Sequence, residues 1–222
     1  MAFDGSTIHC IVDELNQTLL SKKISKIAQP EKEELLITFK GDSETVRLLM
    51  SANASLPFLY LTTENKVSPS VAPNFCMVLR KYIGNGRIVE IKQMDFERVI
   101  RFKIEHLDEL RDLAYKYLYI EIMGKHSNII FCNEQDVIID SIKHISAQVS
   151  SIREVLPGRT YFIPSQENKL NPLEVNETHF QTQVFSKPLS LYQAIFQSFV
   201  GISPMIAMEL CYRVQLDADA SC

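Results

Sequence analysis

The stretch Arg87–Ile104, RIVEIKQMDFERVIRFKI, decides the fold, because apolar residues alternate with polar ones on both sides of a short acidic turn. In its second half, Ile100, Phe102 and Ile104 share one side, and Arg101 and Lys103 share the other. A period of two is typical of a half-buried strand. The stretch therefore predicts two strands joined by a tight turn.

Arg98 begins the core-facing row of this hairpin, directly after Glu97. A guanidinium at that position must extend to solvent at the strand end, or meet an acid or a phosphate. One interpretation is a strand-edge Arg paired with Asp95 or Glu97. The other is an acid–Arg pair that a turn presents on a rigid hairpin to hold a polar ligand. The pattern leaves both open.

The composition is that of an ordinary globular protein, with 46% hydrophobic and 23% charged residues in 222. This length predicts one substantial domain and a smaller one. The formal net charge of −4 does not favour nucleic acid in bulk, so any phosphate contact must use a local basic patch.

The sequence also predicts a reduced, cytoplasmic location and no membrane association. No apolar run approaches the length of a membrane span, and no signal peptide is visible. The sequence contains no H-E-x-x-H, G-x-S-x-G, P-loop or G-x-G-x-x-G pattern. We therefore expect no catalytic residues, cofactor or metal. The five cysteines are scattered and never form a C-x-x-C pair, which predicts thiols rather than disulfides: Cys10, Cys76, Cys132, Cys211 and Cys222.

The remaining periodicity predicts an α+β fold, a mainly antiparallel β-sandwich with flanking helices, because β-α-β alternation is almost absent. A helix opens at Asp4-Gly5-Ser6 and a shorter one runs from Phe75 to Gly84. Other strands are expected at 24–28, 35–40, 45–50, 58–62, 117–122, 128–132 and 137–142, with a turn at Gly41-Asp42-Ser43 and a charged loop at 106–112.

A composition shift at 156–173, which carries three prolines, places the domain boundary. We expect an α+β domain over 1–160, a linker over 161–187 and a truncated helical module over 188–222. Gly201-Ile202-Ser203 followed by Pro204 resembles the turn of a helix–hairpin–helix module, in which amides at Gly201 and Ser203 contact phosphate. A short packing hairpin is the alternative.

Short basic runs occur at Lys22-Lys23 with Lys26, at Arg80-Lys81 with Arg87, and at Arg98, Arg101 and Lys103. Each alone is typical of a solvated face, but together they could form a patch for an RNA backbone. In the turn Gly124–Asn128, Lys125 and His126 could also contact RNA, although a turn His beside a self-bonding Asn128 is the simpler interpretation.

Several strings resemble the N-terminal NFACT domain of the bacterial RqcH / fibronectin-binding protein A family. They are Phe3-Asp4-Gly5, FCMVLRK from Phe75, EIMGKHSNII from Glu121, Asp140-Ser141-Ile142-Lys143-His144 and Leu156-Pro157-Gly158. The resemblance covers the chain from Met1 to about Tyr161 and continues into the helix–hairpin–helix module. It implies a fold similar to the N-terminal domain of formamidopyrimidine-DNA glycosylases, followed by a helical nucleic-acid-binding module.

The resemblance further implies a ribosome quality-control adaptor. Such a protein binds the large ribosomal subunit carrying stalled peptidyl-tRNA and recruits alanyl-tRNA, so that alanine is added to the nascent chain. The family's acid–Arg pair, usually Asp-Arg, matches Glu97-Arg98, and its N-terminal acid matches Asp4. Apart from the resemblance, Lys81, Arg101 and Lys103 are basic residues near the central hairpin, and we expect them to complete the tRNA-binding set through phosphate contacts.

Two alternatives stay open. The family name implies a surface adhesin that binds fibronectin, which the missing signal peptide and unpaired cysteines argue against. The glycosylase-like fold implies a base-excision enzyme, but those enzymes use an N-terminal proline and this chain begins Met-Ala-Phe-Asp.

Overall fold

The computed structural model describes residues 3–41, 45–164, 166 and 168–222. The chain divides into two compact units. We call residues 11–92 and 99–164 the β unit, and residues 1–10, 93–98 and 165–222 the helical unit. The turn of the central hairpin and the first residues of the chain therefore belong with the C-terminal helices.

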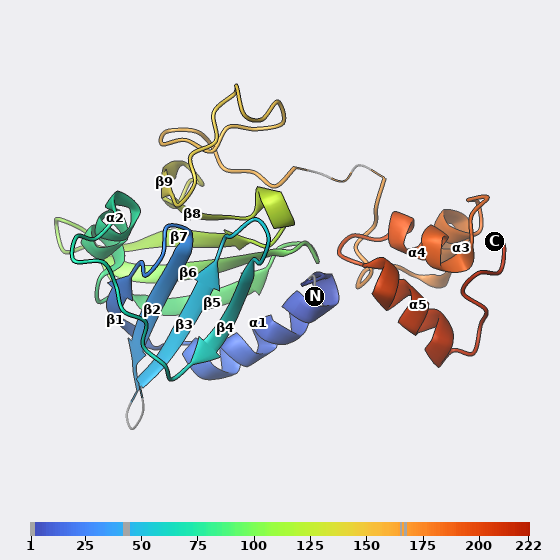
Figure 1. Ribbon diagram of the computed structural model, residues 1–222, viewed down its shortest axis with the longest axis horizontal. Coiled ribbons are helices and arrows are strands. Elements are labelled where there is room, and N and C mark those ends of the chain that lie inside the picture. Colours follow the sequence, from blue (N-terminus) through green and yellow to red (C-terminus); the bar gives the residue numbers. More distant parts are fainter. Residues whose placement is uncertain (1–2, 42–44, 165, 167) are drawn as a thin grey trace. The chain divides into compact units, whose positions relative to one another are not determined.

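The strands of the described chain form one nine-stranded sheet in the order β4-β3-β2-β1-β5-β6-β7-β8-β9. Strands β1 and β5 pair at one position, Lys23 with Arg87, so the sheet has two halves. In Figure 1, β2–β4 cross in front of β6–β8. The predicted α+β class, with a mainly antiparallel sheet, is confirmed. The strands are β1 (Lys23–Ala28), β2 (Glu34–Lys40), β3 (Thr45–Ser51), β4 (Phe58–Thr62), β5 (Arg87–Gln93), β6 (Val99–Leu107), β7 (Leu113–Glu121), β8 (Asn128–Cys132) and β9 (Ile138–Ser141).

The central hairpin has the predicted alternation. Ile100, Phe102 and Ile104 are almost completely buried, whereas Arg101 and Lys103 are half-buried on the other face. The strands run further than the sequence predicts, because antiparallel pairing between β6 and β7 continues to Leu107 and Leu113. The charged loop predicted at 106–112 is therefore shorter, since cross-strand hydrogen bonds outweigh the local polarity of its first residues.

Two helices flank the sheet as predicted. In α1 (Gly5–Leu19) the stripe Ile8, Val12, Leu15 and Leu19 is buried. Helix α2 (Asn74–Ile83) buries Phe75, Cys76, Leu79 and Ile83, and the Arg80 Nε donates to the Ile27 carbonyl of β1 at 2.8 Å. Of the predicted turn Gly41-Asp42-Ser43, residues 42 and 43 lie outside the described part of the chain.

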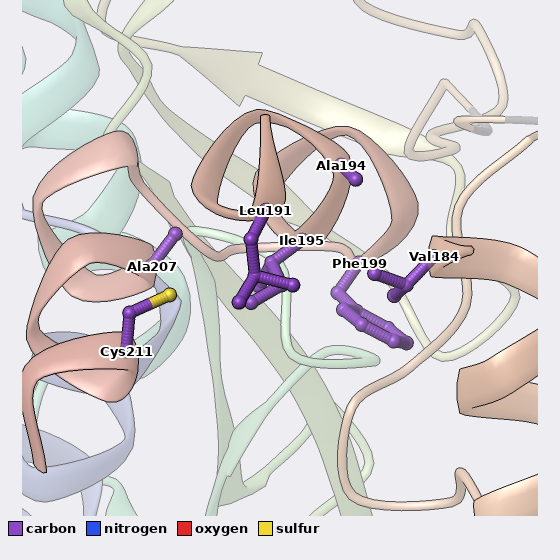
Figure 2. Close-up of a cluster of buried hydrophobic side chains, with 7 residues drawn as sticks. All are labelled: Val184, Leu191, Ala194, Ile195, Phe199, Ala207 and Cys211. Carbon is purple, nitrogen blue, oxygen red and sulfur yellow. The ribbon is translucent and has the colours of Figure 1, made fainter. Parts of the chain in front are cut away.

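The helical unit contains α3 (Glu177–Val184), α4 (Leu191–Ser198) and α5 (Pro204–Arg213). Figure 2 shows the apolar core they share, with residues from all three helices and Phe199 pointing inward. Pro204 opens α5, and the Ser203 hydroxyl accepts from the Ile206 amide at 3.2 Å, as the start signal predicts. Helix α3 lies inside the stretch 161–187 expected as a linker. Its weak apolar periodicity concealed it, although Asn176 caps it and Val184 is fully buried.

A buried ion pair fastens the segment after β9 to the sheet of the β unit. Glu121 of β7 is fully buried, and it accepts from the Arg153 Nη2 at 2.6 Å and from the Tyr161 hydroxyl at 2.9 Å. Burial raises the pKa of Tyr161 well above its ordinary value, and the carboxylate beside it adds to that rise. Because little water reaches this pair, the Glu121 carboxylate and the Arg153 guanidinium each depend on the other for stabilisation of their charge.

We expect Arg153→Met to destabilise the protein strongly, because it leaves the Glu121 carboxylate charged and unpaired inside the sheet. The expected cost is about 3–5 kcal/mol, which thermal unfolding would detect as a fall in Tm of roughly 10 °C. The matched control is Arg159→Met, which breaks the exposed pair between Arg159 and Glu154 and should change stability by less than about 1 kcal/mol. Equal shifts for both variants would contradict the assigned role of the buried pair.

Candidate functional site

The turn of the central hairpin has an unusual backbone. The Glu97 amide donates to the Met94 carbonyl at 2.7 Å, and φ is +45° at Asp95 and +61° at Phe96. Positive φ at both central positions is the pattern of a type I′ turn, which normally takes Asn-Gly. A phenylalanine in the left-handed region costs about 1–2 kcal/mol. The surrounding structure must therefore hold this turn in place.

Two glycines of the helical unit supply that support. A Cβ on Gly201 would lie 2.2 Å from the Phe96 carbonyl oxygen, and a Cβ on Gly5 would lie 2.5 Å from it. The Gly5 amide donates to the Gly201 carbonyl at 2.7 Å, and Gly201 itself has φ +68°. The Gln93 side chain ties the turn further, because its Nε2 donates to the carbonyls of Gly5 and Glu97. No larger residue fits at either glycine without movement of the backbone.

Asp4 joins the start of α1 to the start of α5. Its Oδ1 accepts from the Thr7 amide at 2.9 Å and from the Thr7 hydroxyl at 3.0 Å, and its Oδ2 accepts from the Ser203 hydroxyl at 2.8 Å. The carboxyl is buried. Both of its oxygens therefore already have partners, and a ligand that used Asp4 would have to share or displace one of them.

The Glu97 carboxylate is the polar centre of the site. The residue is only 8% exposed, and its Oε1 accepts from the Gln166 Nε2 at 2.8 Å. Burial raises the pKa of Glu97, while the Gln166 hydrogen bond and the nearby charges of Arg98 and Lys169 oppose that rise. Within the described residues, no side-chain donor bonds its Oε2. This oxygen is thus available to a donor on a ligand.

Two cations accompany the carboxylate. Arg98 is half-buried, and among the described residues it forms no ion pair with Asp95, Glu97 or any other carboxylate. Lys169 donates to the Phe196 carbonyl at 3.0 Å, and burial lowers its pKa. Together, the Glu97 oxygen and the Arg98 guanidinium can hold a ligand that offers a hydrogen-bond donor to the oxygen and an anion or acceptor to the guanidinium.

The predicted residues are divided between the two units. Asp4, Glu97, Arg98, Gly201 and Ser203 belong to the helical unit, and Lys81, Arg101, Lys103, Lys125 and His126 to the β unit. The members of this second group occupy separate places in that unit, as follows.

Arg101 and Lys103 already have partners on the sheet. The Arg101 guanidinium bonds Glu90 at 2.6 Å and lies over the Tyr117 ring at 4.8 Å from its centroid. The Lys103 ammonium lies 4.3 Å from the centroid of Tyr115. Such cation–π contacts contribute about 0.5–1 kcal/mol at exposed sites. A phosphate contact by either cation would have to compete with them.

The remaining predicted cations are exposed. Lys81, in the last turn of α2, lies over the ring of its neighbour Tyr82. Lys125 and His126 lie on the short 3-10 helix η1 (Gly124–His126). The two residues that follow them are buried and structural: the Ser127 hydroxyl accepts from the Met123 amide, and Asn128 bonds the backbone of Lys143 in both directions. Only Lys125 and His126 of this turn are free to meet a ligand.

Sequence reasoning missed Gln93, Gln166, Lys169 and the backbone of Phe96. Glutamine and lysine in a proline-rich segment are typical of a solvated loop, so nothing in the pattern distinguished Gln166 or Lys169. Gly5 and Gly201 carried a weak signal, since Gly5 opens a helix and Gly201 shortly precedes the cap Ser203. Their close approach joins residues almost 200 positions apart, which no local pattern contains.

Residues 4–222 match the family described as NFACT N-terminal and middle domains. The chain belongs to this family. The Rqc2 homolog RqcH of Bacillus subtilis (strain 168) is 36% identical to it over 217 residues, which cover 97% of this chain and 38% of that relative. The chain thus spans well under half the length of this NFACT relative.

Two further NFACT proteins extend the comparison. The ribosome quality control complex subunit NEMF of Homo sapiens is 22% identical over 152 residues, which cover 68% of this chain and 13% of NEMF. The solved N-terminal structure of the fibronectin/fibrinogen-binding protein from Streptococcus suis matches with a TM-score of 0.88 at 35% identity. That match covers 98% of this chain and 81% of the solved chain, and it confirms the NFACT fold.

Two kinds of feature are absent from the described residues, a helix that could cross a membrane and a cluster of metal ligands. None of their helices combines the length and the apolar character that a membrane crossing requires. No group of three or more His, Cys, Asp or Glu residues among them is placed to hold a metal ion.

The pKa of Glu97 gives a test of the site that needs no ligand. Because burial raises this pKa, the folded protein binds the proton more tightly than the unfolded chain does. Stability is therefore lost as the pH rises from the ordinary value of 4.5 through the raised folded value. Glu97→Gln should raise Tm at pH 7.5 and change it much less at pH 4.

Thermal unfolding of this variant at both pH values checks the sign. The control is Glu109→Gln, which replaces an exposed acid of a loop in the β unit and should leave Tm nearly unchanged at either pH. A Tm that falls at pH 7.5 in Glu97→Gln would mean that the charged carboxylate stabilises the fold.

Proposed function

We propose that this chain is the tRNA-holding part of a ribosome quality-control adaptor. The adaptor binds the large ribosomal subunit carrying stalled peptidyl-tRNA and recruits alanyl-tRNA for alanine tailing in the cytoplasm. Membership of the NFACT family and the similarity to RqcH and NEMF support this proposal. The observation that carries it is the Glu97-Arg98 pair on a strained turn that two glycines hold.

Strain and burial coincide at this turn. A phenylalanine in the left-handed region and a buried carboxylate with a raised pKa both lower stability. Such features are characteristic of functional sites, where the arrangement of groups matters more than stability. The chain keeps both on adjacent residues, beside a guanidinium that has no carboxylate partner among the described residues.

In the proposed complex, Arg98 contacts a tRNA phosphate or the acceptor edge of a base. The free Oε2 of Glu97 accepts from a base amine, as carboxylates do with the amino group of cytosine. Gln166 fixes the carboxylate through its other oxygen, so the acceptor already points one way before tRNA arrives. This preorganisation reduces the entropy lost on binding.

The other tRNA-binding residues act outside this pair. Asp4 and Ser203 hold the starts of α1 and α5 together, and therefore position the turn instead of contacting RNA through free oxygens. Arg101, Lys103 and Lys81 contribute to the field that attracts the tRNA, and Lys125 and His126 are exposed contacts. Nothing in this arrangement requires a cofactor, and the role we propose is binding, without catalysis.

A second function is favoured by one comparison. The Streptococcus suis relative is described as a fibronectin/fibrinogen-binding protein, so an adhesin role on the cell surface is the alternative. Fractionation of intact cells separates the two. The adaptor proposal expects the protein with the ribosomes in the lysate, whereas most of it on the surface of unlysed cells would favour the adhesin.

We expect Arg98→Ala to weaken binding of alanine tRNA about 10- to 100-fold, the effect of losing one charge-assisted contact of about 1.5–3 kcal/mol. Its Tm should change by no more than about 2 °C, because no ion pair is lost within the described residues. Filter binding of labelled alanine tRNA, together with thermal unfolding, makes the comparison.

The control variant is Arg159→Ala, an exposed cation of the β unit outside the proposed site. It should bind alanine tRNA as the unchanged chain does. The adaptor proposal fails for this site if Arg98→Ala binds normally, or if it loses stability in proportion to binding.

A further inference from the structure

A group of cations in the β unit shares no residue with the Glu97 site of the helical unit. It gathers on β1, the last turn of α2 and the start of β5. We call it the β1 basic patch, and its members are Lys22, Lys23, Lys26, Arg80, Lys81 and Arg87. All six are exposed except Lys22, which is half-buried. Lys81 is the only one that also belongs to the tRNA-binding set.

A β-bulge places two of these lysines on the same face. The register of β1 against β2 shifts between Ile24 and Lys26, so Ser25 is the extra residue. Ile24 and Ile27 are both buried, and Lys23 and Lys26 are both exposed. In a regular strand, residues three apart lie on opposite faces. The bulge thus turns Lys26 outward to join Lys23, which is a recognised use of bulges at functional surfaces.

Like charges also face each other across strands. Lys23 of β1 pairs in register with Arg87 of β5, and the Ile88 amide donates to the Lys22 carbonyl at 3.1 Å. Like charges directly opposite each other destabilise a sheet. Lys40 of β2 also faces Lys23. It is not a member of the patch, because two acids follow it closely in the sequence, Asp42 and Glu44, which lie outside the described residues.

Helix α2 adds a third side. The Arg80 Nε donates to the Ile27 carbonyl, which anchors that guanidinium beside β1. Arg80 and Lys26 then line one groove of about 320 Å³, together with the backbone around Gly84 and Asn85. A helix C-terminus favours cations, which accounts for Arg80 and Lys81 in the last turn. It does not account for Lys23 and Lys26 on the neighbouring strand β1, or for Lys22 directly before that strand.

The patch has no internal counter-charge. Among the residues that the structure describes, none of its six cations forms an ion pair with a carboxylate. The chain as a whole is acidic, with a formal net charge of −4, so this concentration is not a consequence of overall composition. An external polyanion would remove the repulsion and gain the entropy of released counterions.

We propose that the β1 basic patch binds the phosphate backbone of a structured RNA. Lys23 and Lys26 lie along β1, and Arg87 lies beside Lys23 on the neighbouring strand β5. A nucleic acid offers its phosphates in a similar continuous line. The choice of RNA over another polyanion rests on the proposed function, whose partners are RNAs. The patch contributes a second, sequence-independent contact that does not use Glu97 or Arg98.

The test compares two triple variants of the full chain with equal charge change. The patch variant is Lys23→Gln/Lys26→Gln/Arg87→Gln, and the control is Lys32→Gln/Arg111→Gln/Arg159→Gln, which alters exposed cations elsewhere in the β unit. The probe is a 20-base-pair RNA duplex of arbitrary sequence, titrated across a salt series. Loss of three phosphate contacts should make the slope of log affinity against log salt shallower by about two to three, and weaken binding about tenfold or more.

Three outcomes decide the proposal. The patch variant should lose duplex binding while keeping or raising its Tm, since it removes a cross-strand repulsion. Equal slopes for the two triple variants would overturn the proposal. So would a patch variant that keeps duplex binding but loses binding to phosphatidylserine vesicles. Arg98→Ala in the same assay should keep the duplex slope, so failure of the patch and failure of the Glu97 site are distinguishable.

Discussion

The close approach of Gly5, the Phe96 carbonyl and Gly201 is the constraint on which the helical unit and its candidate site depend. Three chain segments meet there, and two of the three residues have left-handed backbone. A methyl group on either glycine would lie well inside contact distance of the carbonyl oxygen. The helix starts, the turn and the acid–Arg pair are thereby fixed relative to one another within this unit.

That constraint allows the site to keep features that lower stability. An isolated hairpin would relax Phe96 out of the left-handed region and expose Glu97 to water, where its pKa would be ordinary. Contacts of Gln93, Gly5 and Gln166 prevent both changes. The rigidity has a chemical consequence, because a carboxylate fixed through one oxygen presents the other in a defined direction. A flexible loop would have to be ordered on each binding event.

The sequence predicted those parts whose physics is local. The buried stripe of α1, the alternation of β6 and the cap at Ser203 each follow from spacing within a few residues. Arg98 was noticed in the same way, at the start of an apolar row, but the Glu97-Arg98 pair as a tRNA contact came from the family resemblance and stays a prediction. Helix α3 was missed because its stability comes from packing of Val184 into a shared core, with little periodicity of its own. Gln166 was missed because its partner is far away in the sequence.

The two RNA contacts proposed for the chain answer different physical requirements. At the turn, one guanidinium and one oriented oxygen can select a group by geometry, which demands burial and strain. On β1, several solvated cations can attract any phosphate line, which demands only charge density and a bulge that turns Lys26 outward. Long-range attraction decays within about 10 Å at 0.1 M salt. Under the two proposals, the diffuse patch raises the rate of encounter with RNA at short range, and the preorganised pair selects among the groups that arrive. Under both proposals RNA contacts these two places, because a chain with a formal net charge of −4 offers a polyanion little general attraction.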